Sequence, residues 1–278
     1  SVASAICIHI EVPLCATKKH PYEQNGHFLL LLVLGSKSGA VETTLQNGSQ
    51  SLFARQIGPE ENVGTVVAIA GGPGVSGDYL RVLERLATDK FSVVTYDQRA
   101  TGKSSIPLAQ DAFLIERYVH DLEVVRHWTE AEQIHVVGHS WGGVLAMAYA
   151  GTYPEHVASV VLVGSGAPTR EGQHRANTAI YARKKQIEQA LTIHTPPDSL
   201  APECLDWWPY FVAYYANPDR LRAEHLPTSC HPNVTSATWS ALGDYNFTPG
   251  LKQVSAPFLL LYGDTDPLLT TRLEIENS

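Results

Sequence analysis

The fold is decided by one stretch of the sequence, IHVVGHSWGGVLAMAYA, which spans residues 134–150. Its first five residues are mostly apolar, as expected of a strand that is buried on both faces of a sheet. From Val144 onward it is rich in small residues, which predicts a helix packed closely against that sheet. The pentapeptide GHSWG at 138–142 joins the two. A Gly-x-Ser-x-Gly pattern at a strand-to-helix turn exposes its central serine, here Ser140, at the edge of the sheet.

Ser140 is therefore predicted to be a catalytic nucleophile on a nucleophile elbow. The N-terminus of the following helix directs its dipole and its unpaired N–H groups at the reacting centre. Gly138 and Gly142 are expected there because a Cβ at either position would collide with the neighbouring helix or strand. A serine at this turn indicates acyl transfer through a covalent acyl-enzyme. His139 is expected to pack or to line the rim of the site, and not to act as the base.

Strand and helix patterns alternate on both sides of this turn. Strands are predicted at residues 41–45, 51–55, 65–70, 91–97, 134–138, 157–164 and 256–264, and helices at 78–86, 115–129 and 144–153. The 78–86 helix is expected to bury Tyr79, Val82, Leu83 and Leu86. Asn47-Gly48 predicts a hairpin turn between the first two strands. Buried strands that alternate with helices predict a mostly parallel, doubly wound sheet, and with the serine turn they predict the α/β-hydrolase fold.

The strand rhythm stops after residue 164, and this predicts the domain organisation. Residues 39–164 and 252–278 are expected to form the hydrolase core. Residues 165–251, with helical patterns at 176–191 and 205–215, are expected to form an inserted helical cap. The last strand and helix of this fold are not recognisable in the sequence. Residues 1–38 form an N-terminal extension to which the sequence assigns no clear role.

A glycine-rich loop, GGPG at residues 71–74, follows the strand at 65–70. An acyl-enzyme mechanism needs two N–H donors where negative charge develops on the substrate oxygen. Trp141, the residue after the nucleophile, is expected to supply one donor. Gly72 is expected to supply the other, because glycines let the backbone approach the substrate closely. Gly71 is a candidate substrate-binding residue in the same loop.

Three segments resemble the proline iminopeptidase family, serine peptidases of the α/β-hydrolase fold. They are GGPG at 71–74, YDQR at 96–99 followed by Gly102 and Ser104, and GHSWGG at 138–143. The spacing between the segments also matches that family. The resemblance extends from about residue 40 to residue 270, and it is weak between 165 and 251.

The resemblance implies release of an N-terminal residue, often proline, from short peptides, and recognition of the free amine by carboxylates of the cap. Glu203 and Asp206 are the candidates here, and the alternative is that they only solvate or cap a helix. The chain departs from the family pattern at two positions. Ala70 stands where the family has His, which removes a side chain that braces the loop, and Ala100 stands where it has Gly.

The acid of a Ser-Asp-His triad lies in the loop after a late buried strand. The family pattern places it at Asp266, with Asp264 as the second choice. The triad histidine should come later in the chain, but no histidine follows Asp266. The acid would orient an imidazole and stabilise its charged form.

Three explanations for the missing base stay open. The favoured one is that the chain is a truncated or aberrant product. In the second, a permuted arrangement supplies the base from His27, with residues 5–11 as the last strand. In the third, the base comes from the cap, from His225 or His231, or the chain binds without catalysing. Loss of the base would remove most of the catalysis and leave the pocket intact.

The charge and the apolar runs of the sequence disfavour several classes of partner and location. The formal net charge of −8 disfavours nucleic acid and anionic membranes as partners. No stretch approaches the roughly 20 apolar residues that cross a bilayer. The order basic, apolar, small over residues 18–40 is that of a secretory signal, but the apolar part is short, so a cytoplasmic location is favoured over secretion. The expected partner is a small molecule or a short peptide, and no oligomeric state is assigned.

The four cysteines include no CxxC pair, so a zinc site is not expected, and no metal or organic cofactor is needed. Cys204 and Cys230 are interpreted as thiols in preference to a disulfide. The favoured function is an aminopeptidase that releases N-terminal proline or a similar residue. The alternatives are an esterase or lactonase on the same scaffold, and a catalytically impaired binding protein.

Overall fold

The computed structural model of the chain describes residues 39–59, 63–106, 111–187, 195–215 and 217–278. The candidate base His27 and the signal-like stretch up to residue 38 lie outside the described residues. Among the described helices, none is both long enough and apolar enough to cross a membrane.

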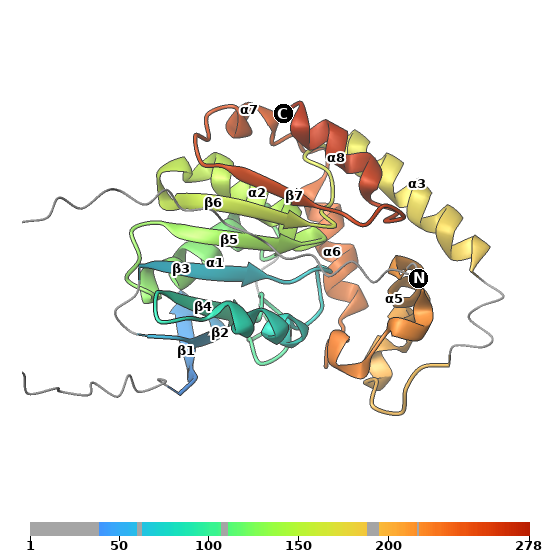
Figure 1. Ribbon diagram of the computed structural model, residues 1–278, viewed down its shortest axis with the longest axis horizontal. Helices are drawn as coiled ribbons and strands as arrows, with labels where there is room; N and C mark the ends of the chain where they lie inside the picture. Colours follow the sequence, from blue (N-terminus) through green and yellow to red (C-terminus); the bar gives the residue numbers. More distant parts are fainter. Residues whose placement is uncertain (1–38, 60–62, 107–110, 188–194, 216) are drawn as a thin grey trace, which may run out of the picture. The chain divides into compact units, whose positions relative to one another are not determined.

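The described residues form one seven-stranded sheet in the order β1-β2-β4-β3-β5-β6-β7 (Figure 1). The strands are β1 (Val41–Asn47), β2 (Gln50–Ile57), β3 (Gly64–Ile69), β4 (Phe91–Tyr96), β5 (Ile134–His139), β6 (Val157–Val163) and β7 (Phe258–Leu261). β2 pairs antiparallel with β1 and β4, and all other neighbours are parallel. The predicted α/β-hydrolase sheet is confirmed, including the hairpin turn, where Gly48 has φ 62°.

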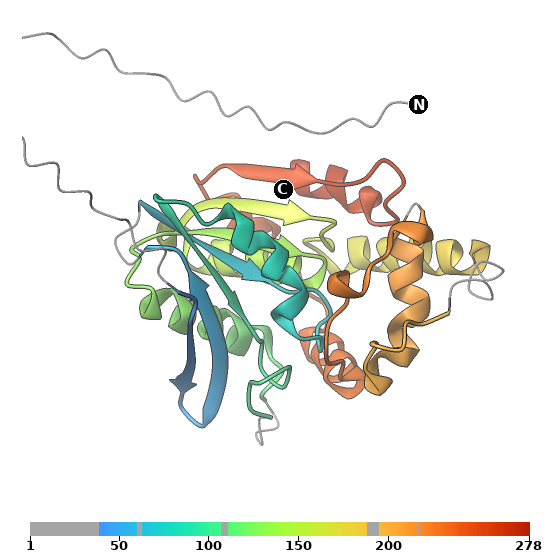
Figure 2. The same ribbon diagram turned by 60° about the horizontal axis from the view of Figure 1, so that its bottom comes forward.

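Both faces of the central strands are covered, which explains their continuous apolar sequences. Alternate side chains of β3 point to opposite faces. Val67 and Ile69 belong to the main core with helices α1 (Ile115–Trp128) and α2 (Trp141–Thr152). Val66 and Ala68 face the other side, where residues of η1 (Gly77–Leu86) pack. Figure 2 shows η1 in front of the sheet and α1 behind it.

η1 corrects the expectation for residues 78–86, because it is a 3-10 helix and not an α-helix. Three residues per turn align Leu80 with Leu83. Leu80 is therefore buried, although the α-helical spacing did not predict its burial. Val82 and Leu86, which were predicted to be buried, are each about half exposed.

The segment between β6 and β7 contains helices and no strand among its described residues. Its helices are α3 (Arg170–Gln186), η3 (Pro202–Trp207), α5 (Trp208–Tyr214), η4 (Pro218–Arg220), η5 (Ala223–His225), α6 (Pro232–Leu242) and α7 (Thr248–Leu251). α3 begins six residues before the predicted start at 176, because the Thr169 hydroxyl caps it by accepting the N–H of Gly172 at 3.1 Å. Residues 188–191 of the predicted helix lie outside the described residues.

Two further helices complete the described chain. η2 (Pro154–His156) connects α2 to β6, and α8 (Leu269–Glu276) follows β7. The sequence patterns did not predict α8. It lies beside α3 (Figure 1), where Arg175 forms an ion pair with Glu274 at 2.7 Å. β7 is shorter than the predicted strand at 256–264, and Leu259 and Leu261 remain about half exposed.

Candidate active site

Ser140 occupies a strained turn between β5 and α2. Its backbone has φ 54° and ψ −117°, a conformation that a residue with a side chain adopts only where its surroundings enforce it. The Ser140 N–H donates to the carbonyl of Val163 at 3.1 Å, which fixes the turn against β6. A Cβ at Gly138 would strike the backbone of Gly142, and one at Gly142 would strike the carbonyl of Ile69. The predicted reason for both glycines is confirmed.

The 71–74 loop passes directly beside this turn. A Cβ on Gly71 would lie 3.1 Å from the Cβ of Ser140 and 3.1 Å from the Nδ1 atom of His139. Gly72 has φ 115°, in the region that favours glycine. The loop backbone therefore lies close to Ser140 at Gly71, where a side chain would be crowded against the serine.

Two hydrogen-bond chains join this loop to the residues on either side of Ser140. In the first, the Gln98 amide donates to the Ala70 carbonyl at 2.9 Å and accepts from the indole N–H of Trp141 at 2.9 Å. In the second, the Gly71 N–H donates to the Tyr79 hydroxyl at 2.7 Å, and this hydroxyl lies 2.7 Å from Nδ1 of His139.

The protonation of His139 follows from its position. Burial lowers the pKa of the His139 imidazole to about 4, so the ring is neutral at pH 7. The Tyr79 hydroxyl accepts from Gly71 and is also hydrogen-bonded to Nδ1 of the neutral His139 ring. The ring also packs edge-on against Tyr79, with ring centroids 5.6 Å apart.

Asp266 lies in the loop between β7 and α8, and its side chain lines the same cavity as Ser140. Its Oδ1 atom accepts the N–H of Leu268 at 2.8 Å. Burial raises the pKa of the Asp266 carboxyl, and the Leu268 hydrogen bond offsets part of this effect. The second choice, Asp264, is exposed.

Two cavities meet at Ser140. The first, of about 490 Å³, has the polar residues Gln173, Asn177 and Asp206 in its lining. Its lining also includes the aromatic residues Trp207, Tyr210, Tyr214 and Trp239, together with Gly72 and Trp141. Its size and its few convergent polar groups are typical of a site for a small ligand.

The second cavity, of about 480 Å³, contains Ser140, Asp266 and His139. Its lining is mainly apolar and aromatic and comes from η1, the central strands and the segment between β6 and β7: Val75, Leu80, Leu83, Val137, Val163, Phe211, Tyr214 and Leu226. Three aromatic residues line both cavities: Trp207, Tyr210 and Tyr214.

The two candidate amine-binding carboxylates have different positions. Asp206 lines the first cavity, as does the next residue, Trp207. Glu203 is exposed and, as far as the described residues go, lines neither cavity that contains Ser140.

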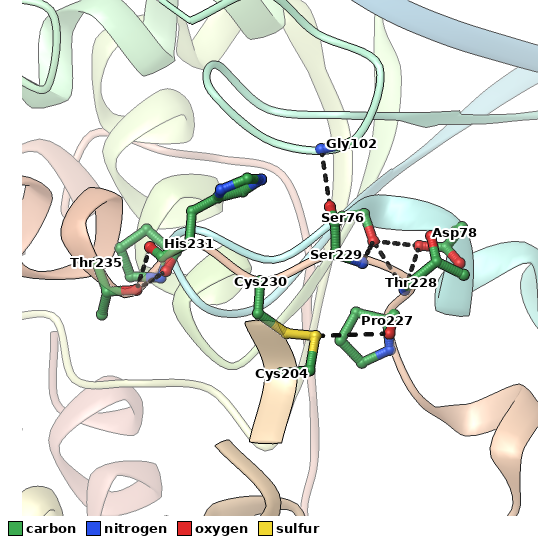
Figure 3. The surroundings of a disulfide bond; sticks show 11 residues. Ser76, Asp78, Gly102, Cys204, Pro227, Thr228, Ser229, Cys230, His231 and Thr235 are labelled. Carbon is green, nitrogen blue, oxygen red and sulfur yellow. Dashed lines mark hydrogen bonds between the residues drawn. A yellow bond between two sulfur atoms is a disulfide. The ribbon is translucent and has the colours of Figure 1, made fainter. Parts of the chain in front are cut away.

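Cys204 and Cys230 form a disulfide with a Cα–Cα distance of 5.0 Å, so the expectation of two thiols is wrong. The separation of 26 residues in the sequence did not indicate that the two cysteines lie close together. Cys230 pairs with Val75 in an isolated antiparallel bridge, and Ser76 N–H donates to the Ser229 carbonyl at 3.1 Å. Figure 3 shows that the disulfide joins η3 to the segment that carries these contacts.

No imidazole in the described part of the chain is hydrogen-bonded to Ser140 or Asp266. His225 lines the second cavity, but its Nδ1 atom lies 3.1 Å from the Tyr215 hydroxyl and 3.3 Å from the Arg222 amide. The His231 N–H donates to the Gly74 carbonyl at 2.7 Å, which places its backbone against the 71–74 loop.

Within the described ranges, no cluster of three or more His, Cys, Asp or Glu residues is arranged to hold a metal ion. The sequence reasoning missed the roles of Gln98 and Tyr79 in joining the loop to the turn. Gln98 was visible only as part of the YDQR segment, and Tyr79 only as one apolar position of a helix.

The chain matches the α/β hydrolase fold family over residues 64–273. It is 38% identical to a proline iminopeptidase of Lactobacillus delbrueckii subsp. bulgaricus over 249 residues, covering 82% of this chain and 83% of that protein. Among solved structures, a proline iminopeptidase of Mycobacterium smegmatis superposes with a TM-score of 0.61 at 20% identity, over 85% of this chain and 86% of that one. An esterase from Exiguobacterium antarcticum has a TM-score of 0.59 at 18% identity, over 85% and 87% of the two chains.

The two structural matches show the fold alone, since both are of low sequence identity. The match to the Lactobacillus protein extends over most of both chains and includes the serine turn and the glycine-rich loop. The chain therefore belongs to the proline iminopeptidase family of α/β-hydrolases.

Proposed function

We propose that the protein is a serine hydrolase that releases N-terminal proline, or a similar residue, from short peptides. The observation that carries this proposal is the placement of Ser140 on a strained turn at the meeting point of two cavities, beside the 71–74 loop. We interpret this turn as a nucleophile elbow. Asp266, in the same cavity as Ser140, is the proposed acid.

The proposed reaction begins with attack of the Ser140 hydroxyl oxygen on the carbonyl carbon of the scissile amide. Negative charge develops on the carbonyl oxygen, and the N–H groups of Gly72 and Trp141 are the proposed donors to it. The Trp141 N–H is the first of α2, where backbone amides have no acceptor within the helix. Collapse of this intermediate expels the peptide amine and leaves an ester on Ser140, which water then hydrolyses.

The hydroxyl of Ser140 needs a general base for this attack. Asp266 would orient an imidazole and stabilise its charged form. His139 is held by Tyr79, and the Nδ1 atom of His225 faces Tyr215 and Arg222.

We assign the N-terminal residue of the substrate to the first cavity. Its amine is cationic at neutral pH and is attracted to the Asp206 carboxylate. The rings of Trp207, Tyr210 and Trp239 offer apolar faces for a proline ring. Glu203, outside the cavity, has no part in this assignment.

One experiment separates the hydrolase proposal from a binding protein. The wild-type chain and Ser140→Ala are exposed to a fluorophosphonate probe, and the labelled peptide is identified by mass spectrometry. We expect labelling at Ser140 in the wild-type protein alone. If Ser140 stays unlabelled while the protein still binds prolyl peptides, the hydrolase proposal is refuted and the binding-protein alternative stands.

A second experiment tests the substrate class. Hydrolysis of prolyl p-nitroanilide is compared with that of its N-acetylated form and of a p-nitrophenyl ester without an amine. Asp206→Asn is expected to raise KM for the free-amine substrate by roughly 2- to 5-fold, the effect of losing an ion pair to an exposed carboxylate. Glu203→Gln is the matched control and is expected to behave as wild type. Equal effects of the two variants would contradict the assignment of the first cavity.

An esterase is the second candidate function, and the apolar lining of the second cavity favours it. This cavity also reaches Ser140 and Asp266, and it has room for an acyl chain. Rapid turnover of p-nitrophenyl butyrate, with no effect of a free amine on any substrate, would favour the esterase over the peptidase.

A further inference from the structure

We propose that Gln98 and Tyr79 are positioning residues that together fix the 71–74 loop in register with Ser140. This inference rests on the proposed function, because the loop is proposed to hold one of the two donors to the reacting oxygen. It adds two residues that act on the site through other residues and do not contact the reacting atoms.

Gln98 connects the start of the loop to the residue that follows Ser140. Its amide N–H donates to the Ala70 carbonyl at 2.9 Å, and its amide oxygen accepts from the Trp141 indole at 2.9 Å. Both side chains are almost fully buried, with Gln98 2% and Trp141 1% exposed. Neither hydrogen bond can be replaced by bulk water, so both are maintained in the folded protein.

Tyr79 connects the next residue of the loop to the residue that precedes Ser140. Its hydroxyl accepts the Gly71 N–H at 2.7 Å and lies 2.7 Å from Nδ1 of His139. Burial keeps the His139 ring neutral at pH 7, so its hydrogen bond with the Tyr79 hydroxyl joins two uncharged groups. A continuous hydrogen-bond chain therefore runs from Gly71 through Tyr79 to His139.

The two connections are paired along the sequence. Ala70, which directly precedes the 71–74 loop, and Gly71, its first residue, are hydrogen-bonded through Gln98 and Tyr79 to the two residues that flank Ser140. Ala70 has no polar side chain of its own, so the loop is held through its backbone by side chains from η1 and from the segment after β4. The Ala70 carbonyl and the Gly71 N–H belong to one planar peptide group, so the pairing constrains the distance between loop and turn and fixes the orientation of the Ala70-Gly71 peptide, which directly precedes the Gly71-Gly72 peptide.

Such a constraint matters because donors to a developing oxyanion must be in place before the reaction. A displacement of about 1 Å can lower a rate by about 100-fold. Loss of either connection also leaves a buried polar group without its partner. We therefore expect the variants to impair the chemical step more than substrate binding.

The test uses the full chain and the variants Tyr79→Phe, Gln98→Leu and Gln98→Glu. Gln98→Glu keeps an acceptor for Trp141 but loses the donor to Ala70. Tyr118→Phe is the matched control: its ring packs against Trp141 with centroids 5.7 Å apart, but its hydroxyl bonds to Thr238 and not to the loop. Thermal unfolding of each variant verifies that it is folded, and Tyr79→Phe, which loses one oxygen atom, remains informative if Gln98→Leu does not fold.

Two measurements are made on each folded variant. Hydrogen–deuterium exchange of residues 70–74 is expected to be at least about 10-fold faster in Tyr79→Phe and Gln98→Leu, since each connection lost makes local opening easier. For prolyl p-nitroanilide, kcat is expected to fall roughly 10- to 100-fold with KM changed less than about 3-fold. Tyr118→Phe is expected to change neither.

The outcomes separate this inference from the proposed function. Wild-type exchange rates of residues 70–74 in both Tyr79→Phe and Gln98→Leu would overturn the inference, whatever the activity. So would a rise in KM with unchanged kcat. If the wild-type protein neither reacts with a fluorophosphonate nor hydrolyses any substrate, the proposed function is wrong, and the exchange rates alone then decide whether Gln98 and Tyr79 fix the loop.

Discussion

Cys204 and Cys230 are joined by a disulfide that links the wall of the first cavity to the segment beside the 71–74 loop. Cys204 lies in η3, two residues before Asp206. Cys230 is bridged to Val75, the residue after that loop. The Gly102 N–H also donates to the Ser229 hydroxyl at 3.2 Å (Figure 3), which attaches the same segment to the loop after β4.

The first prediction concerns this disulfide. Replacement of both cysteines by serine is expected to lower the free energy of unfolding by about 3.5 kcal/mol, the value for a bridge across a sequence separation of 26. Urea denaturation with and without a dithiol reductant measures this. The reductant should destabilise the wild type and leave the double variant unchanged, because the variant has no such bridge to lose. Equal midpoints of all four samples would contradict the prediction.

The second prediction concerns the contact between α2 and β3. Gly142→Ala would place a Cβ against the carbonyl of Ile69, with the Ala70 carbonyl 2.7 Å away. Overpacking of this kind typically costs roughly 1–3 kcal/mol. Thermal unfolding is expected to show that loss, and fluorophosphonate labelling of Ser140 should slow because the loop is displaced. Gly39→Ala is the control, since nothing lies within 4 Å of its added Cβ. Wild-type behaviour of Gly142→Ala would disprove the close approach.

The third prediction concerns the buried ion pair of Arg99 and Asp121. The guanidinium contacts both carboxylate oxygens at 2.8 Å, and the two side chains are 4% and 1% exposed. Arg99→Met would leave a buried carboxylate without its charge partner, at a cost of about 3–5 kcal/mol. Urea denaturation of Arg99→Met, of Asp121→Asn and of the double variant gives the coupling energy. Additive effects of the two single variants would contradict a specific pair.

The pH dependence of Arg99→Met provides a further check on that pair. Burial raises the pKa of the Asp121 carboxyl, and Arg99 opposes this rise. Without Arg99 the pKa of Asp121 in the folded state is higher still. The variant therefore loses stability as the pH rises through this folded-state pKa. The deficit of Arg99→Met relative to wild type should therefore be smaller in acid than at pH 7. A deficit independent of pH would indicate that packing alone explains it.

The fourth prediction concerns Glu123 and acid unfolding. Burial alone would raise the pKa of its carboxyl, but hydrogen bonds from Arg126 and Tyr149 and the charges of Arg126 and His156 together lower it to about 2. A depressed folded-state pKa contributes stability above the unfolded value and loses it as pH falls from about 5 to 2. The contribution is on the order of 2 kcal/mol at pH 7. Glu123→Gln should lose this amount and show a flatter acid limb in chemical denaturation.

Glu155→Gln is the matched control for Glu123→Gln. Glu155 also faces His156, at 3.8 Å, but its side chain is 64% exposed. Exposed pairs of this kind contribute little to stability. An acid limb that is equally steep in wild type and in Glu123→Gln would show that another carboxylate controls acid unfolding.

The sequence by itself determined the sheet and the position of the serine turn. Buried parallel strands need continuous apolar runs. The runs around residues 65–70, 91–97 and 134–138 are local patterns that are visible in the sequence alone. Gly138 and Gly142 were also predictable, because a close crossing of strand and helix excludes a Cβ. The wrong predictions concerned elements whose form depends on packing. An example is η1, which is a 3-10 helix with three residues per turn and not the expected α-helix.

Only the tertiary structure decided which side chains meet. Cys204 and Cys230 form a disulfide, Asp206 and not Glu203 lines the cavity with Ser140, and Gln98 and Tyr79 tie the loop to the turn. Each of these contacts joins residues that are distant in the sequence. The strand crossovers of the sheet and the segment between β6 and β7 bring them together. Periodicity reports which face of an element is buried. It carries no information on the partner across the interface, because that partner is fixed by long-range packing of the whole fold.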